Sequence, residues 1–375
     1  MAIKVSDDKY KTIIKVAGGE EKFVCPQALI LNAYQGCDFN CVYCYADWIR
    51  DIYKHRDKVG SYYVFKRQLI KALKGETNDE VSQLLRQKVP IRMSNLSDPF
   101  QYREEDNKIS YRILKTLKKV SYPVILNTKG VLWAKDKYLD LLKDMDVVVQ
   151  ETIITDDDEL AGKLEPNAPS PSERIKAINK ASELGINTQV RYSPVFPLLN
   201  DVPESLFDKL EVNDIITEFM RFSLNKSHIK ALNDALGYDY FEMLKEEGYP
   251  IVKGSKWLKV SQDFIFEEYR RFKRLAEERG LNLFVCSEEK PEINGFENCC
   301  GTCKYNGFES CMDWTVQMRG EVFEDGEKSF NEYITGSCPY KKEFKEYWDD
   351  GKLEGSLTGL KKKGDSYVRR KNENS

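Results

Sequence analysis

Three closely spaced cysteines are the residues in this sequence best suited to chemistry. Cys37, Cys41 and Cys44 form a C-x₃-C-x₂-C pattern, and no further Cys or His follows until His55. So short a loop can place three thiolates around one face of a [4Fe-4S] cluster, which leaves one iron open to a small molecule. A structural zinc site is the alternative, although such a site normally needs four closing ligands.

Composition narrows the class of protein. The 375 residues include 58 basic and 61 acidic side chains, a balance that argues against dependence on non-specific phosphate contacts. Only two histidines are present, so the sequence offers few candidates for a His general base or for a His-rich metal site. Residues 1–22 hold no apolar run of signal-peptide length, and no stretch is long enough to span a membrane. We therefore expect a cytoplasmic protein with no membrane contact, whose ten cysteines serve as metal ligands more than as disulfides.

Short apolar runs alternate with helical periodicity along most of the chain. This alternation predicts βα units and a parallel sheet, either an open doubly wound sheet or a barrel. Because the cysteine loop directly follows the first strand, we favour a partial (β/α)6 barrel of the TIM type, in which loops at the strand ends converge on one site. The expected strands are 28–33, 89–95, 123–127, 146–151, 187–192, 215–222 and 281–286, and the expected helices include 64–73, 80–87, 109–120, 132–143 and one that begins at Ser170 and ends before Gly185.

Four regions follow from these patterns. Residues 1–22 form an N-terminal extension, 23–286 the barrel, 287–345 a Cys-rich region and 346–375 a polar, basic tail. We expect the tail to be solvated and disordered, with nucleic-acid contact as the alternative.

Polar residues follow several of the expected strands. A hydroxyl and a carboxylate after the second strand could hold a small polar ligand, but a Ser-Asp-Pro turn explains them equally well. A lysine after the third strand can direct a point charge at a carboxylate. Charged residues that end buried strands are costly unless they face a polar cavity or form an ion pair. The candidates are Ser97, Asp98, Gln101 and Glu104 after strand two, Lys129 after strand three, Glu151 and Thr152 after strand four, and Arg191 in strand five.

A second cysteine group lies near the C-terminus, among several glycines. Its close spacing fits an auxiliary iron–sulfur cluster or a structural zinc, and buried inert thiols are the third interpretation. Its members are Cys299, Cys300, Cys303, Cys311 and Cys338, with Cys286 upstream.

The cysteine spacing, with Tyr43 before the third cysteine, resembles the signature of the radical SAM enzymes. Over about residues 28–201 the chain resembles one branch in particular, the spore photoproduct lyase-like (SplB-like) proteins. The resemblance depends on the cysteine loop, on Ser97-Asp98-Pro99-Phe100-Gln101, on Thr128-Lys129, on the run from Thr155 to Arg174 that includes Glu165-Pro166, and on Pro194, Pro197 and Asn200-Asp201.

This resemblance implies roles for individual residues. Cys37, Cys41 and Cys44 would bind the cluster, and Tyr43 would lie against the adenine of S-adenosylmethionine (SAM). Ser97 and Lys129 would contact the methionine part of SAM, and Thr152 would supply a hydroxyl where the family often has Ser. The positions of Asp98 and Arg191 at strand ends, independent of the resemblance, add their carboxylate and guanidinium to the predicted cofactor site.

The implied reaction begins with an electron from a flavodoxin or ferredoxin. The reduced cluster cleaves SAM to methionine and a 5′-deoxyadenosyl radical, which abstracts hydrogen from the substrate. Spore photoproduct lyases also use a hydrogen-donating cysteine two residues before the matching Ser, and this chain has Asn95 there. We therefore expect a different substrate.

Three functions remain open from the sequence. The chain could modify or repair a nucleic acid. It could instead act on a peptide, a protein or a small molecule, with an auxiliary cluster in the C-terminal region. It could also be a non-enzymatic zinc-binding protein.

Overall fold

The computed structural model describes residues 14–16, 29–44, 46, 58–86, 88–253, 257–286, 360–363 and 366–369. The second cysteine group, apart from Cys286, lies outside these residues, as do most of the expected N-terminal extension and the whole of 287–345. The predictions about an auxiliary metal site and about these regions therefore stay predictions.

A parallel sheet forms the centre of the described part of the protein. Its seven parallel strands follow one another in chain order, and the short strand β1 (Lys15–Val16) pairs antiparallel with β2 at one edge. This arrangement confirms the prediction of a partial TIM-type barrel. The parallel strands are β2 (Leu29–Leu31), β5 (Ile91–Met93), β6 (Val124–Thr128), β7 (Val147–Thr152), β8 (Asn187–Val195), β9 (Asp214–Phe219) and β13 (Asn282–Val285).

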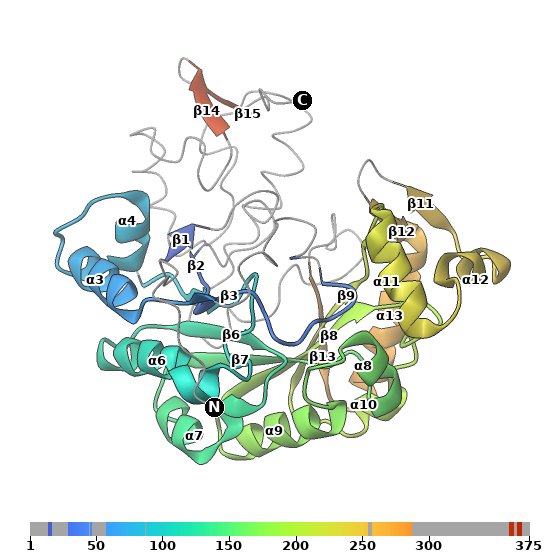
Figure 1. The fold of residues 1–375 in the computed structure, drawn as a ribbon, viewed down its shortest axis with the longest axis horizontal. Coiled ribbons are helices and arrows are strands. Elements are labelled where there is room, and N and C mark those ends of the chain that lie inside the picture. Colours follow the sequence, from blue (N-terminus) through green and yellow to red (C-terminus); the bar gives the residue numbers. More distant parts are fainter. Residues whose placement is uncertain are drawn as a thin grey trace.

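Helices connect the strands and cover one face of the sheet (Figure 1). α9 begins with the predicted capping box, in which the Ser170 side chain accepts from the Glu173 N–H and the Glu173 side chain accepts from the Ser170 N–H. Apart from two helices between β9 and α13, the helices between β4 (Lys58–Val59) and β13 are α3 (Tyr62–Leu73), α4 (Glu80–Arg86), α5 (Glu104–Asn107), α6 (Ile109–Lys119), α7 (Asp136–Leu142), α8 (Asp158–Leu164), α9 (Pro171–Glu183), α10 (Glu204–Phe207) and α13 (Gln262–Glu277).

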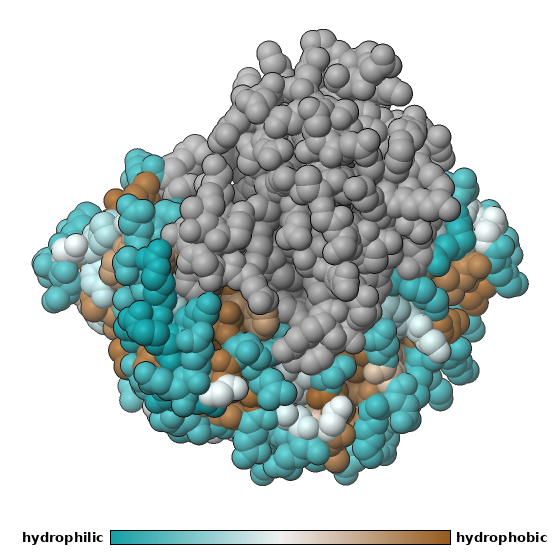
Figure 2. Space-filling view, turned by 180° about the vertical axis from the view of Figure 1, so that it is seen from behind, coloured by the Kyte–Doolittle hydropathy of each residue, from teal (hydrophilic) through white to brown (hydrophobic). Residues whose placement is uncertain are grey.

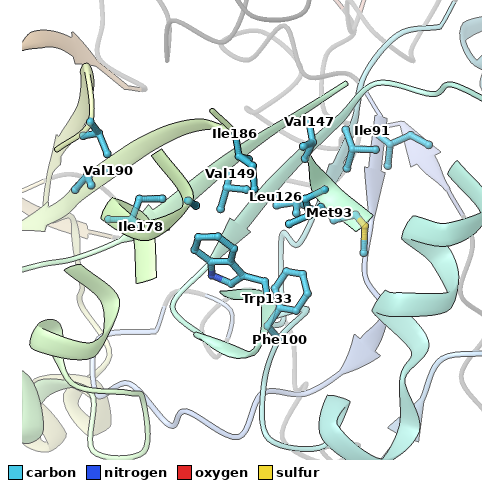
Figure 3. Close-up of a cluster of buried hydrophobic side chains, with 14 of the residues drawn as sticks. Ile91, Met93, Phe100, Leu126, Trp133, Val147, Val149, Ile178, Ile186 and Val190 are labelled. Carbon is cyan, nitrogen blue, oxygen red and sulfur yellow. The ribbon is translucent and has the colours of Figure 1, made fainter. Parts of the chain in front are cut away.

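The main core lies between these helices and the sheet. Alternate strand residues point to one face, so Leu126 and Val149 enter the core while their neighbours point the other way. The rings of Trp133 and Phe100 lie next to each other beneath Leu126 and Val149 (Figure 3). Both rings are fully buried, and they close the core at the end of the sheet from which the loops after β5 and β6 leave.

Several segments differ from the prediction, and α8, for example, was not expected. The helix expected over 132–143 is divided into a 3-10 turn, η2 (Leu132–Ala134), and α7, because Lys135 is extended (φ −69°, ψ 144°). Residues between β9 and α13 form an unpredicted insertion, comprising β10 (Phe222–Ser223), α11 (Lys226–Leu236), α12 (Tyr240–Glu246), β11 (Ile251–Lys253) and β12 (Trp257–Val260). The basic tail, expected to be disordered, contains a hairpin of β14 (Leu360–Lys363) and β15 (Ser366–Arg369).

The surface of the described part of the protein carries both hydrophilic and hydrophobic residues. From behind, mainly hydrophilic residues surround separate hydrophobic patches (Figure 2). Within the described ranges, no helix combines the length and apolar character that crossing a membrane would require.

Candidate functional site: the cysteine loop and its supports

The cysteine loop, residues 36–44, follows β2 and the short strand β3 (Tyr34–Gln35), which pairs with β4. Cys37, Cys41 and Cys44 are half-buried and form no disulfide. Backbone N–H groups of Phe39 and Asp98 donate to the Cys37 sulfur and favour its thiolate. Hydrogen bonds of this kind to cluster sulfurs are among the features that tune iron–sulfur centres.

The three thiols lie close enough to influence one another electrostatically. Burial, and next the Asp98 carboxylate, raises the pKa of Cys37 to about 12. Burial also raises the pKa of Cys41 well above its ordinary value, an effect that the Lys129 ammonium opposes. Bringing these thiols together as thiolates therefore requires added positive charge, which a bound metal centre would supply.

The number of thiols bears on the kind of metal centre. A closed structural zinc site normally needs four protein ligands. A [4Fe-4S] cluster held by three thiolates keeps one iron open. The three unbridged thiols of the loop therefore fit a cluster that has one open iron.

The first support of the loop comes from residues after β5. The fully buried Gln101 accepts from the Asp38 N–H (2.9 Å) and donates to the Gly36 carbonyl (3.3 Å). Arg103 forms an ion pair with Asp38, with 2.9 Å between Nε and Oδ1. These contacts fix the chain on either side of Cys37.

The second support comes from the turn between α8 and α9. The Val42 N–H donates to the Leu164 carbonyl (2.9 Å), which fixes the loop between Cys41 and Cys44. Asn167 donates from its backbone to the Phe39 carbonyl (3.2 Å) and from its side chain to the Asp38 carbonyl (3.1 Å). The loop is therefore held by backbone contacts along most of its length.

Between these supports lies a buried group of charges. The Tyr43 hydroxyl donates to Glu165, whose carboxylate is fully buried. Glu165 Oε2 lies 2.6 Å from Arg174 Nη2, and its Oε1 lies 3.8 Å from Lys129 Nζ. Burial alone would raise the pKa of Glu165, but Arg174 and Lys129 together hold it below its ordinary value. Arg174 also donates to the Thr152 carbonyl at the end of β7 (3.0 Å).

Asp98 holds the end of β6 in place. Its Oδ1 accepts from the Thr128 hydroxyl (2.7 Å) and the Phe100 N–H (2.8 Å), and its Oδ2 accepts from the Lys129 N–H (2.7 Å). Both carboxylate oxygens of Asp98 therefore already accept hydrogen bonds from the protein, and Asp98 fixes the backbone of Lys129. Gly130 follows, where an added Cβ would lie 2.4 Å from the Phe100 carbonyl oxygen, so only glycine fits this turn.

Three other predicted polar residues are engaged inside the protein. The Ser97 hydroxyl donates to the Tyr34 carbonyl (2.8 Å). Glu104 is buried and accepts from two tyrosine hydroxyls and two backbone N–H groups. Glu151 points toward Trp133, whose Nε1 donates to it (2.8 Å), and burial raises the pKa of Glu151 well above its ordinary value. For Glu104 and Glu151 the structure supports a structural role.

Arg191 lies in β8, directly across from Thr152 in β7, and its side chain contacts a different set of residues. Its Nη1 is 3.5 Å from Gln150 Oε1 and its Nη2 is 3.6 Å from Cys286 Sγ. A contact from Arg191 to SAM therefore stays a prediction. Two residues of the cysteine loop also line a small apolar pocket, whose full lining is Val42, Tyr43, Met220, Phe222, His228, Ile229, Leu232 and Phe241.

The sequence assigns no role to Glu165 or Arg174 beyond their place in a motif, and it indicates Gln101 only as a polar candidate after strand two. Each is polar yet fully buried. The signal was weak because partners of Gln101 and Glu165 lie far away along the chain, such as Tyr43, which is 122 residues from Glu165.

Comparisons with known proteins agree with this geometry. Residues 31–210 match the family model of the radical SAM superfamily. An uncharacterized protein of Methanocaldococcus jannaschii is 34% identical over 174 residues, which are 46% of this chain and 62% of that protein. An uncharacterized protein of Acidianus two-tailed virus is 29% identical over 233 residues, 60% of this chain and 73% of that one. This chain thus spans less than two thirds of the first relative's length.

Among solved structures, a variant of spore photoproduct lyase with bound AdoMet and a dinucleoside spore photoproduct has a similar fold. The TM-score is 0.50 at 14% identity, and the match covers 69% of this chain and 76% of that one. Residues 31–210 therefore match the radical SAM superfamily, and the described part of the chain has a fold similar to that of the spore photoproduct lyase structure.

Proposed function

We propose that this chain is a radical SAM enzyme in which Cys37, Cys41 and Cys44 bind a [4Fe-4S] cluster and the open iron binds SAM. The single observation that supports this most is the loop itself. Three unbridged thiols follow the first strand of the parallel sheet, and backbone N–H groups donate to one of them. When bound, the cluster supplies one electron that splits the SAM sulfonium into methionine and a hydrogen-abstracting 5′-deoxyadenosyl radical.

The protein's own residues would bind and orient the cofactor. The Lys129 ammonium lies 5.6 Å from the centre of the Tyr43 ring, at the mouth of the cysteine loop. It could meet the carboxylate of SAM there while the ring lies against the adenine. The Thr152 hydroxyl, at the end of the neighbouring strand β7, would also contact SAM. A flavodoxin or ferredoxin would provide the electron.

The substrate differs, in this proposal, from that of spore photoproduct lyase. The position of the hydrogen-donating cysteine is occupied by Asn95, whose backbone N–H donates to the Asn32 side chain (2.9 Å). An amide side chain cannot return a hydrogen atom as a thiol does. A nucleic acid, a peptide and a small molecule all stay candidates for the substrate.

Anaerobic reconstitution with iron and sulfide tests the proposal. The wild type should become brown with an absorbance shoulder near ~400 nm and hold about four irons per chain, or about eight if a second cluster forms. With SAM and dithionite it should release 5′-deoxyadenosine, measured by mass spectrometry. The proposal fails if the reconstituted wild type binds zinc in place of iron or releases no 5′-deoxyadenosine.

The variant Cys41→Ala should lose both the cluster in the loop and the release of 5′-deoxyadenosine. Cys25→Ala is the matched control, because Cys25 is isolated in the sequence. The control should keep the iron content and product yield of the wild type. Equal losses in both variants would show that the cluster does not depend on the C-x₃-C-x₂-C loop.

A further inference from the structure

Glu165 contacts residues from separate segments that carry predicted cofactor-binding groups. It accepts a hydrogen bond from Tyr43 in the cysteine loop and lies 3.8 Å from Lys129 at the end of β6. Its partner Arg174 donates to the Thr152 carbonyl at the end of β7. One buried ion pair therefore connects the cysteine loop with the ends of two neighbouring strands.

The geometry of the pair is closely determined. Arg174 is fully buried, and its planar guanidinium makes three directed contacts, with Nη2 to Glu165 (2.6 Å), Nε to the Pro169 carbonyl (2.7 Å) and Nη1 to the Thr152 carbonyl (3.0 Å). Charge-assisted hydrogen bonds of this kind are strong and directional. A fixed guanidinium leaves the Glu165 carboxylate little freedom, and the carboxylate in turn limits where Tyr43 and Lys129 can lie.

Stability alone does not account for these charges. Apolar side chains of similar volume often stabilise a protein at least as well as a buried ion pair. Here the buried carboxylate faces two cations and a tyrosine hydroxyl, all next to the cysteine loop. The placement of the charges at the loop points to a function in arranging the site.

Building on the function proposed above, we propose that Glu165 is a positioning residue of the cofactor site, held in place by Arg174. Its carboxylate fixes the Tyr43 ring and the Lys129 ammonium in the relative position that SAM requires. Glu165 itself does not touch the cofactor. Its effect is exerted through the Tyr43 hydroxyl and through the charge of Lys129.

The variant Tyr43→Phe tests this link with the least disturbance, because it keeps the ring and every charge and removes only the hydroxyl. Each reconstituted protein is titrated anaerobically with SAM, and binding is followed by the change in the EPR spectrum of the reduced cluster. Iron content and the thermal midpoint are measured on the same samples. We expect iron content equal to the wild type, SAM affinity weaker by roughly three- to tenfold, and an altered EPR spectrum of the SAM-bound form.

Tyr240→Phe is the matched control. The Tyr240 hydroxyl is also buried and donates to a protein oxygen, the Pro197 carbonyl (2.8 Å), and both tyrosine rings pack against Phe196. This variant should keep the SAM affinity and spectrum of the wild type. Arg174→Lys keeps the charge but loses the planar fork, and it should weaken SAM binding at least as much as Tyr43→Phe.

The results separate this inference from the proposed function. If the wild type binds a cluster and SAM, and Tyr43→Phe binds SAM with the same affinity and spectrum, the positioning role of Glu165 is wrong. An equal loss in Tyr43→Phe and Tyr240→Phe would also overturn it, since the effect would then be general. If the wild type takes up no cluster, the proposed function fails instead.

Discussion

Two fully buried glutamates support the segment that carries the cysteines, and their surroundings differ. Glu104 accepts from the hydroxyl of Tyr34, which lies just before the cysteine loop, and Glu165 accepts from the hydroxyl of Tyr43 within it. The other partners of Glu104 are neutral, namely the Tyr138 hydroxyl and two backbone N–H groups. The other partners of Glu165 are the cations Arg174 and Lys129.

The electrostatic consequence is opposite at the two sites. Burial raises the pKa of Glu104, because its hydrogen bonds compensate only part of the lost hydration. Burial acts on Glu165 too, but the two cations hold its pKa below the ordinary value. We infer that the region around Glu104 serves chiefly to join β3, α6 and α7. The region around Glu165 keeps a permanent negative charge next to the cysteine loop.

Removing the charge of Glu165 should have the largest effect. Glu165→Gln leaves the buried Arg174 guanidinium without its carboxylate, and breaking a buried pair in this way typically costs about 3–5 kcal/mol. Chemical denaturation of the metal-free protein measures the change in the free energy of unfolding. A loss below about 1 kcal/mol would mean that water or another acid compensates Arg174, and the contrast with Glu104 would disappear.

The matching change at the other glutamate should cost less. Glu104→Gln removes no ion pair, but its amide group would face hydrogen-bond donors that the carboxylate now accepts from. We expect a loss of about 1–3 kcal/mol, the usual penalty for buried polar groups left without partners. Denaturation under the same conditions as for Glu165→Gln gives the comparison directly. A loss equal to or above that of Glu165→Gln would show that the neutral network is the stronger support.

Much of this arrangement could be predicted from the sequence. The strands were recognised because burial on both faces of a parallel sheet requires continuous apolar runs, such as Val147–Val149 in β7. The start of α9 was recognised because Ser170, Pro171 and Glu173 form a local pattern that does not depend on the rest of the fold. The cysteine loop was found in the same way, from residues close together in the chain.

What the sequence did not predict depends on distant contacts. The hydrogen bond between Glu165 and Tyr43 joins residues that are 122 positions apart, and no periodicity of the sequence indicates it. The insertion between β9 and α13 consists of strands of two to four residues, the seven-residue helix α12 and the 11-residue helix α11, and its strands are too short for a clear pattern. The interruption at Lys135 carries no glycine or proline. It accompanies the burial of Trp133 against Glu151, again a tertiary effect.

The smallest predicted effect is a difference in pH dependence. A raised pKa means that folded protein binds the Glu104 proton more tightly than unfolded protein does. This contribution to stability is complete below the ordinary carboxyl pKa and is lost as the pH rises through the raised value. The lowered pKa of Glu165 has the opposite sign, so its contribution is complete above the ordinary pKa and is lost only as the pH falls through the lowered value.

Thermal unfolding of the wild type and both glutamine variants from about pH 5 to pH 8 measures these contributions. The stability advantage of the wild type over Glu104→Gln should shrink as the pH rises. Its advantage over Glu165→Gln should stay constant across the same range, because that carboxylate remains charged throughout. Parallel curves for the two variants would mean that Lys129 and Arg174 do not determine the charge of Glu165, and that the two regions are electrostatically alike.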